Sequence, residues 1–229
     1  MVDVVCVNWG TRYGREYTHH LFSMVRRNTA RSFRFYCLTD RPTTYGGDIT
    51  PIALPAGLTG WWNKMQLFRP GVLPAGEYLY FDLDVVIVDN IDCLLDFAGF
   101  GIARDFINPD TGILGGKEYN SSVMKFRPNE YVWYAFEDNR SQWDAIQAKA
   151  PFFGDQNVIS HYLNTKGYSH PFPDDWIWSF KMGTQRGRRP VEHDKFYGAA
   201  IPPGGKVCVF HGFPKPADVD VDWVRQNWK

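Results

Sequence analysis

The chain has 229 residues, enough for one well-packed domain, and its 25 Lys and Arg residues balance 25 Asp and Glu residues. A net charge of zero lacks the basic character of nucleic-acid-binding proteins, so we expect no nucleic-acid partner. No apolar run approaches the roughly 20 residues of a membrane span, and no basic stretch followed by a long apolar one marks a signal peptide. The four cysteines lack zinc-site spacing and indicate buried, reduced thiols. We therefore expect a cytoplasmic protein without a membrane span.

The first part of the chain has the pattern of an α/β protein. Residues 2–7 form an apolar run that predicts a strand, and residues 13–27 predict a helix with one apolar face. Residues 33–38 predict a second strand. Residues 49–54 predict a third, at a sheet edge because Pro51 cannot donate a ladder hydrogen bond. This β–α–β–β order begins a doubly wound sheet, in which ligands bind beyond the carboxyl ends of the strands.

The rest of the chain continues the same alternation. It predicts a short helix over residues 61–68, an apolar strand over 78–88, strands at 120–126 and 206–210, and a helix from residue 155 to 163. No change in composition marks a boundary, so we predict a single domain over residues 1–229. Its nucleotide-binding part would extend over about 1–90 and its acceptor-side part over about 91–229.

Two segments leave alternatives open. Trp176, Trp178 and Phe180 alternate at strand spacing, which suits either a platform for a sugar acceptor or packing in the core. The basic run at residues 186–190 either closes over phosphates or is a solvated loop. Aromatic residues make up 17% of the chain and include nine Trp, a composition that also suits carbohydrate.

The pair Asp82 and Asp84 is the most informative local feature, because it interrupts the apolar run YLYFDLDVVIV. Residues two apart on a strand point to one face, so both carboxylates can reach one ligand. Buried carboxylates need compensation, and Mg²⁺ or Mn²⁺ provides it while bridging to substrate phosphates. The alternative is that one aspartate caps a turn and the other is solvated.

A second candidate group follows the last predicted strand, in the segment HGFPKP. His211 offers an imidazole ligand for Mn²⁺, and Lys215 can neutralise a phosphate. Gly212 would let the backbone approach a ligand closely. The alternative is a histidine that is hydrogen-bonded in a turn.

In chain order, seven segments together resemble the glycogenin-like glycosyltransferases, that is, glycosyltransferase family 8 and related enzymes of the GT-A fold. The segments are VCVNWGTRY, WNKMQLF, YFDLDVVIV, IARDF, YNSSVMKF, FGDQNVIS and HGFPKP, and they extend over nearly the whole chain. The resemblance implies an α/β fold, a single Rossmann-like GT-A domain with a mostly parallel central sheet. The family's NSG is replaced here by Asn120-Ser121-Ser122.

The resemblance also implies roles for individual residues. Asp82, Asp84 and His211 would bind Mn²⁺, with Mg²⁺ as the alternative. Asp155 and Gln156 would lie beside the anomeric carbon, where we expect them to position the sugar and stabilise an oxocarbenium-like state. The remaining matched residues would contact the nucleotide-sugar donor: Asn8, Trp9, Tyr13, Lys64, Asp105, Asn120, Gly212 and Lys215.

The function implied is metal-dependent, retaining transfer of a hexose from a UDP-sugar. The acceptor stays open among a glycan, a lipid-linked sugar, a protein side chain and a small molecule, and so does the oligomeric state. Two other classes fit part of the pattern. A sugar-phosphate nucleotidyltransferase would carry a denser glycine-rich loop than Gly10 and Gly14 provide. A non-catalytic carbohydrate-binding protein suits the Trp content but does not need the full set of metal and phosphate residues.

Overall fold

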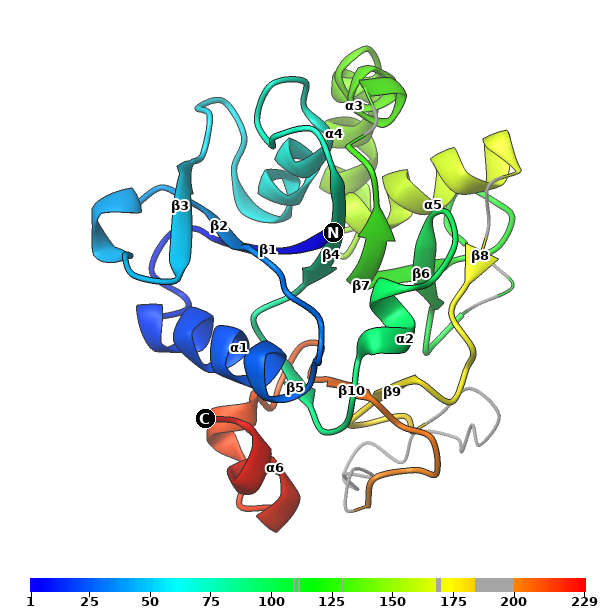
Figure 1. The fold of residues 1–229 in the computed structure, drawn as a ribbon. Coiled ribbons are helices and arrows are strands. Elements are labelled where there is room, and N and C mark those ends of the chain that lie inside the picture. The colour runs from blue at the N-terminus through cyan, green and yellow to red at the C-terminus, as the bar shows by residue number, and fades with distance from the viewer. Residues whose placement is uncertain (109, 111, 129, 168–169, 184–199) are drawn as a thin grey trace.

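Seven strands form the central sheet of the computed structural model, which describes residues 1–108, 110, 112–128, 130–167, 170–183 and 200–229 (Figure 1). Their order is β3-β2-β1-β4-β7-β6-β8, and β7 alone is antiparallel to its neighbours. The prediction of a mostly parallel α/β sheet is confirmed. The strands are β1 (Val2–Asn8), β2 (Phe35–Thr39), β3 (Ile49–Ala53), β4 (Glu77–Phe81), β6 (Gly101–Arg104), β7 (Tyr119–Phe126) and β8 (His170–Pro171).

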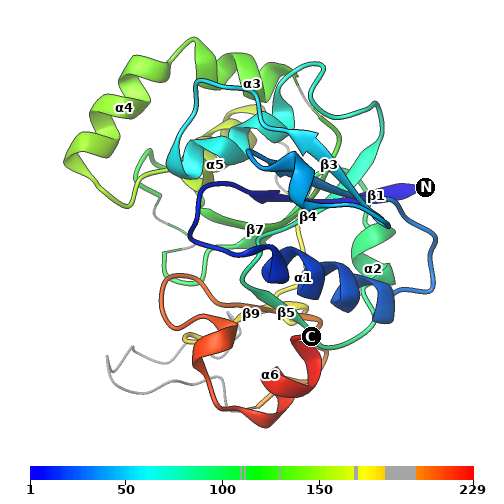
Figure 2. The same cartoon turned by 90° about the vertical axis from the view of Figure 1, so that its left-hand side faces the viewer.

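Helices cover both faces of this sheet, as Figure 2 shows, with α3, α4 and α5 on one side and α1 on the other. Alternate residues of β1 therefore enter different cores. Val4 and Cys6 pack in the cluster that includes α1, whereas Val5 and Val7 pack in the cluster beneath η2, α3 and α5. The helical elements of the described residues are α1 (Arg15–Arg27), η1 (Pro42–Thr44), η2 (Gly60–Phe68), α2 (Asp92–Leu95), α3 (Glu130–Glu137), α4 (Arg140–Lys149), α5 (Asp155–Lys166), η4 (Pro216–Asp218) and α6 (Asp222–Asn227).

A second, three-stranded sheet lies on the α1 side. It consists of β5 (Val85–Ile87), β10 (Val207–Val209) and β9 (Ile177–Ser179), with β10 in the middle. The sequence-based prediction of one strand over residues 78–88 is therefore wrong. The run divides into β4 and β5, which belong to different sheets, and the two aspartates lie in the turn that connects them. The continuous apolar pattern hides this division because both strands are buried.

The structure settles one of the two open alternatives. Trp178 and Phe180 are buried in the core on the α1 side, and Trp176 packs against it, so this alternation reflects core packing. The basic run at residues 186–190 lies outside the described residues. Pro51 lies in β3 at the sheet edge, as predicted. No helix in the described part of the chain has both the length and the apolar character needed to cross a membrane.

Candidate active site

Most of the predicted site residues meet at one edge of the central sheet, where β1, β4 and β6 have their carboxyl ends. Asn8 ends β1, Asp82 follows β4, and Asp105 follows β6. The antiparallel β7 begins at the same edge with Tyr119 and Asn120. This is the edge at which open α/β sheets bind their ligands.

The turn that carries Asp82 and Asp84 is anchored to both sheets. The Asp82 backbone N–H donates to the carbonyl of Ser122 in β7 at 2.8 Å. The carbonyl of Asp84 accepts from the backbone N–H of Phe210, which follows β10, at 3.0 Å. The positions of the two aspartates are thus fixed by the junction of the sheets and not by a single strand face.

Asp84 is buried, and one of its oxygens is held by two side chains. The Tyr13 hydroxyl donates to Asp84 Oδ2 at 2.9 Å, and the ammonium group of Lys215 forms an ion pair with the same oxygen. Lys215 also donates to the carbonyl of Phe210 at 3.3 Å. Burial and the charge of Asp82 raise the pKa of Asp84, and Lys215 opposes this effect. Tyr13 and Lys215, both predicted to contact the donor, therefore lie beside the aspartate pair.

Asp82 is paired with a second lysine, Lys64, whose side chain is only 12% exposed. Lys64 Nζ lies 3.0 Å from Asp82 Oδ1 and 3.0 Å from Asp155 Oδ2, and it donates to Ser121 Oγ at 2.9 Å. Burial alone would lower the pKa of Lys64, but Asp155 and Asp82 outweigh it and raise the pKa above its ordinary value. Ser121 also donates to Asp155 Oδ2 at 2.7 Å. The ammonium group of Lys64 thus joins the aspartate pair to the first turn of α5.

A chain of amides joins three further predicted residues. Gln156 Nε2 donates to Asp105 Oδ1 at 3.3 Å, and Asn120 Nδ2 donates to Gln156 Oε1 at 3.3 Å. The other oxygen of Asp105 accepts the backbone N–H groups of Ile107 and Asn108 at 3.0 and 2.8 Å. Because both ends of the Gln156 amide are engaged, its orientation is fixed. The structure brings Asp105, Asn120 and Gln156 together as one polar group.

His211 directly follows Phe210, but within the described residues it does not complete a three-ligand group with Asp82 and Asp84. Its Nε2 lies 2.7 Å from Ser179 Oγ, and its ring stacks on Phe106 with centroids 5.8 Å apart. Burial, together with the charges of Lys181 and Lys215, lowers the pKa of His211 to about 4, so the imidazole is neutral at pH 7. Next to it, Gly212 has a φ of 71°, which suits glycine, and a Cβ there would lie 3.1 Å from Lys181 Nζ.

The donor chemistry of the aspartate pair fits a hard divalent cation. Asp82 Oδ2 and Asp84 Oδ1 accept no hydrogen bond from the described residues, while the partner oxygen of each is held by a lysine. Carboxylate oxygens are the ligands that Mg²⁺ and Mn²⁺ prefer, and such ions commonly complete their shell with substrate phosphates. Nowhere in the described ranges do three His, Cys, Asp or Glu side chains gather as a complete metal site.

Asn8 and Trp9 have supporting positions. Asn8 is fully buried, and its Nδ2 donates to Thr18 Oγ1 at 3.0 Å and to the Tyr45 hydroxyl at 2.8 Å. These bonds fix the connection between β1 and α1. Trp9 is half-buried and packs against the core beneath the helical face. Their contact with the donor stays a prediction.

The structure adds a residue that no sequence pattern had selected. Glu118 is buried beside Asp105, accepts from Asn157 Nδ2 at 3.1 Å, and has its pKa raised to about 7, chiefly by burial. The segment KEYN has the composition of an ordinary polar stretch before a strand, so no sequence pattern singled out this glutamate. Ser121, which holds Lys64 and Asp155, was likewise visible only as part of the NSS segment.

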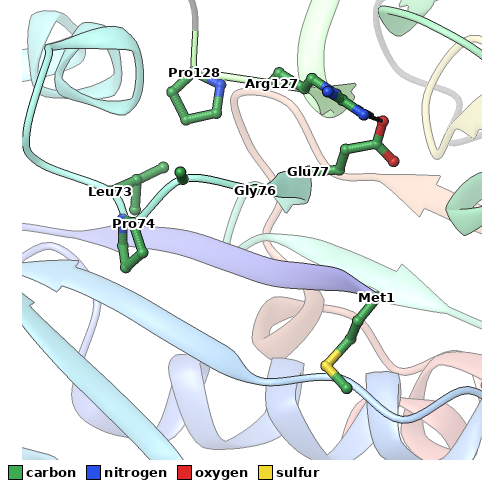
Figure 3. Close-up of a pocket in the computed structure, with 8 residues that line it drawn as sticks. Met1, Leu73, Pro74, Gly76, Glu77, Arg127 and Pro128 are labelled. Atoms are coloured by element: carbon green, nitrogen blue, oxygen red, sulfur yellow. Dashed lines mark hydrogen bonds and ion pairs between the residues drawn. The ribbon is translucent and has the colours of Figure 1, made fainter.

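A pocket of about 590 Å³ opens elsewhere, at the amino ends of β1 and β4 (Figure 3). Arg127 Nη2 lies 2.8 Å from Glu77 Oε1 in its wall, so these two charges neutralise each other. Its lining consists of Met1, Leu73, Pro74, Ala75, Gly76, Glu77, Arg127 and Pro128. None of the predicted site residues is among them, so this pocket is separate from the candidate site.

The fold is that of known glycosyltransferases. No protein-family model matches the sequence, and no curated protein matches it. Among solved structures, the galactosyltransferase LgtC in complex with donor and acceptor sugar analogs superposes with a TM-score of 0.65 at 15% identity, over 100% of this chain and 97% of that one. The chain has the GT-A fold. The prediction made from the motif order is confirmed at this level.

Two larger proteins share the fold. The glycosyltransferase GlyE of Streptococcus pneumoniae superposes with a TM-score of 0.61 at 14% identity, over 100% of this chain and 62% of that one. The bifunctional glycosyltransferase WbbM superposes with a TM-score of 0.55 at 14% identity, over 94% and 46%. At such identities the likeness concerns the fold, and the argument about activity depends on the site residues.

Proposed function

We propose that the chain is a metal-dependent glycosyltransferase that moves a hexose from a UDP-sugar to an acceptor with retention of configuration. One observation carries this proposal: two aspartates at the ligand-binding edge of a GT-A fold are each paired with a lysine, and each keeps one oxygen that no described residue engages. LgtC, which shares the fold, has been solved with donor and acceptor sugar analogs. That likeness supports a nucleotide-sugar donor and a sugar acceptor here.

Asp82 and Asp84 would hold the ion, Mn²⁺ or Mg²⁺, and the neutral imidazole of His211 is the proposed third ligand. When bound, the ion supplies Lewis acidity that stabilises the charge developing on the diphosphate leaving group. The ammonium group of Lys215, which neutralises Asp84 in this structure, would add direct charge stabilisation to that diphosphate.

The sugar would be oriented by the polar group of Asp105, Asn120 and Gln156, whose shared hydrogen bonds fix each side chain before the donor binds. Asp155 is held by Lys64 and Ser121, which favours a positioning and electrostatic role over that of a nucleophile. In the transfer, the bond from the anomeric carbon to the diphosphate oxygen breaks. The acceptor oxygen bonds to the same face of that carbon, and its proton passes to the departing diphosphate.

The test is UDP release from a panel of UDP-hexoses with Mn²⁺, comparing the wild type with Asp84→Asn. The matched control is Asp48→Asn, an exposed aspartate paired with Arg26. We expect release from at least one donor, unchanged in the control and slowed at least about 100-fold in Asp84→Asn.

Three outcomes would contradict the proposal. A folded protein that releases UDP from no donor with either metal would not be this transferase. Release of pyrophosphate from UTP and a sugar phosphate would indicate a nucleotidyltransferase. Binding of glycans without turnover of any donor would indicate a carbohydrate-binding protein.

A further inference from the structure

Two aromatic side chains next to the candidate site are open to solvent. Trp61 is 43% exposed, and Phe152 is 90% exposed. Among the described residues, neither ring stacks on another aromatic ring, and the indole N–H of Trp61 has no hydrogen-bond acceptor. An exposed aromatic ring beside a polar site offers an apolar face on which a ligand can stack.

Trp61 is placed at the site by the geometry of η2. Side chains three residues apart eclipse each other in a 3₁₀-helix, so Trp61 lies in line with Lys64. Lys64 turns inward to Asp82 and Asp155, whereas Trp61 lies at the solvent end of the same row. The row therefore leads from the buried cation to an open indole ring.

The indole also lies against the start of α5. A Cβ on Gly154 would lie 2.9 Å from Trp61 Cε3, so the absence of a side chain at Gly154 makes room for the ring. The backbone of Gly154 is extended, with a φ of −163°, and any residue can adopt it. Steric contact with Trp61, and not the backbone conformation, therefore explains why position 154 is a glycine. Asp155 and Gln156 follow directly in the chain, and Phe152 precedes Gly154 by two residues.

We infer that Trp61 and Phe152 form the subsite for the acceptor, and that the acceptor presents a sugar ring. This inference rests on the proposed function. An indole ring packs well on the C–H face of a sugar, while its N–H can donate to a hydroxyl. Trp61 lies beside the start of α5, where Asp155 and Gln156 are proposed to position the donor hexose. A sugar stacked on Trp61 would therefore have a hydroxyl group close to that hexose. The platform considered at residues 176–180 is not available, since Trp178 and Phe180 are buried.

The experiment begins with wild-type protein on an array of neutral and acidic glycans, in the presence of UDP and Mn²⁺. The best-bound glycan then serves as acceptor for Trp61→Ala, Trp61→Phe and Phe152→Ala. The control is Tyr134→Ala, which removes a 49%-exposed aromatic side chain from α3. We expect Trp61→Ala to raise the acceptor KM about tenfold more than the donor KM, Phe152→Ala to raise it less, Trp61→Phe to restore most of the loss, and Tyr134→Ala to change neither constant.

The outcomes separate this inference from the proposed function. If the enzyme transfers sugar and Trp61→Ala leaves the acceptor KM at the wild-type value, the inference is wrong while the transferase proposal stands. The wild type could also bind glycans on the array without releasing UDP from any donor. If Trp61→Ala then abolishes that glycan binding, the aromatic subsite is supported and the transferase proposal is not. Wild-type protein that binds no glycan on the array would overturn the inference directly.

Discussion

Lys64 Nζ lies 3.0 Å from Asp155 Oδ2 and so joins η2 to the first turn of α5. The same ammonium group lies 3.0 Å from Asp82, the first aspartate of the proposed metal-binding pair. Two carboxylates with different proposed tasks, one for the metal and one for the sugar, therefore share a single, largely enclosed cation. The geometry of the site depends on this lysine as much as on the aspartates.

Replacing Lys64 by Met should destabilise the protein strongly. The change leaves Asp82 and Asp155 without their shared countercharge, and breaking a buried ion pair from one side typically costs about 3–5 kcal/mol. Urea denaturation of Lys64→Met, with the exposed Lys166→Met as control, measures this loss. The double variant Lys64→Met with Asp155→Asn should regain part of it. A single variant as stable as the control would show that the cation does not compensate these carboxylates.

Replacing Lys215 by Met should change two affinities in opposite directions. Without its lysine, Asp84 keeps its negative charge unneutralised, so Mn²⁺ alone should bind more tightly, by about threefold to tenfold. UDP in the presence of Mn²⁺ should bind more weakly, because the diphosphate loses a cation. Calorimetric titration of each ligand measures both effects. If the affinities for Mn²⁺ and for UDP changed in the same direction, Lys215 would not pair with Asp84 in the free protein and with the diphosphate in the complex.

Glu118 should make stability depend on pH. Its folded-state pKa of about 7 lies above the ordinary value of 4.5, so the folded protein binds the proton more tightly than the unfolded chain. The stabilisation is complete below pH 4.5 and is lost as the pH rises through about 7. Glu118→Gln cannot ionise and should therefore gain about 1–3 kcal/mol over the wild type between pH 5 and pH 8. Melting curves across this range test the difference, and a gap that is constant with pH would rule out Glu118 as its source.

Gly154→Ala should force Trp61 to move. The new methyl group would lie 2.9 Å from Trp61 Cε3, and overpacking of this kind typically costs about 1–3 kcal/mol. Part of any loss reflects a poorer helix cap, because Gly154 is the N-cap of α5. A double-mutant cycle with Trp61→Ala separates the two contributions, since only the steric part disappears when the indole is gone. Additive effects in that cycle would mean that the two residues do not press on each other.

Much of the fold could be predicted because its strands are short apolar runs bounded by turn residues. The helix expected over residues 13–27 is α1, and the strand expected over 49–54 is the edge strand β3, where Pro51 needs no ladder partner. The aspartate pair and the start of α5 at Asp155 were visible in the sequence because carboxylates stand out beside buried apolar residues.

The rest depends on contacts between distant segments. The division of the apolar run into β4 and β5 could not be predicted from the sequence. Both strands are buried, so the run stays apolar where the chain leaves one sheet and enters the other. The partners of the aspartates were also hidden, since Lys215 is 131 residues away from Asp84 in the chain. Glu118 could not be selected from the sequence, because only the folded structure shows that this residue is buried.

The measurement that tests the central claim most directly is calorimetric titration of UDP into the wild type and Asp84→Asn, with Mn²⁺ and with EDTA. If Asp82 and Asp84 hold a metal that carries the diphosphate, UDP binds the wild type with Mn²⁺, and EDTA or Asp84→Asn abolishes that binding. UDP binding that is unaffected by both EDTA and Asp84→Asn, or no binding under any condition, would contradict the account.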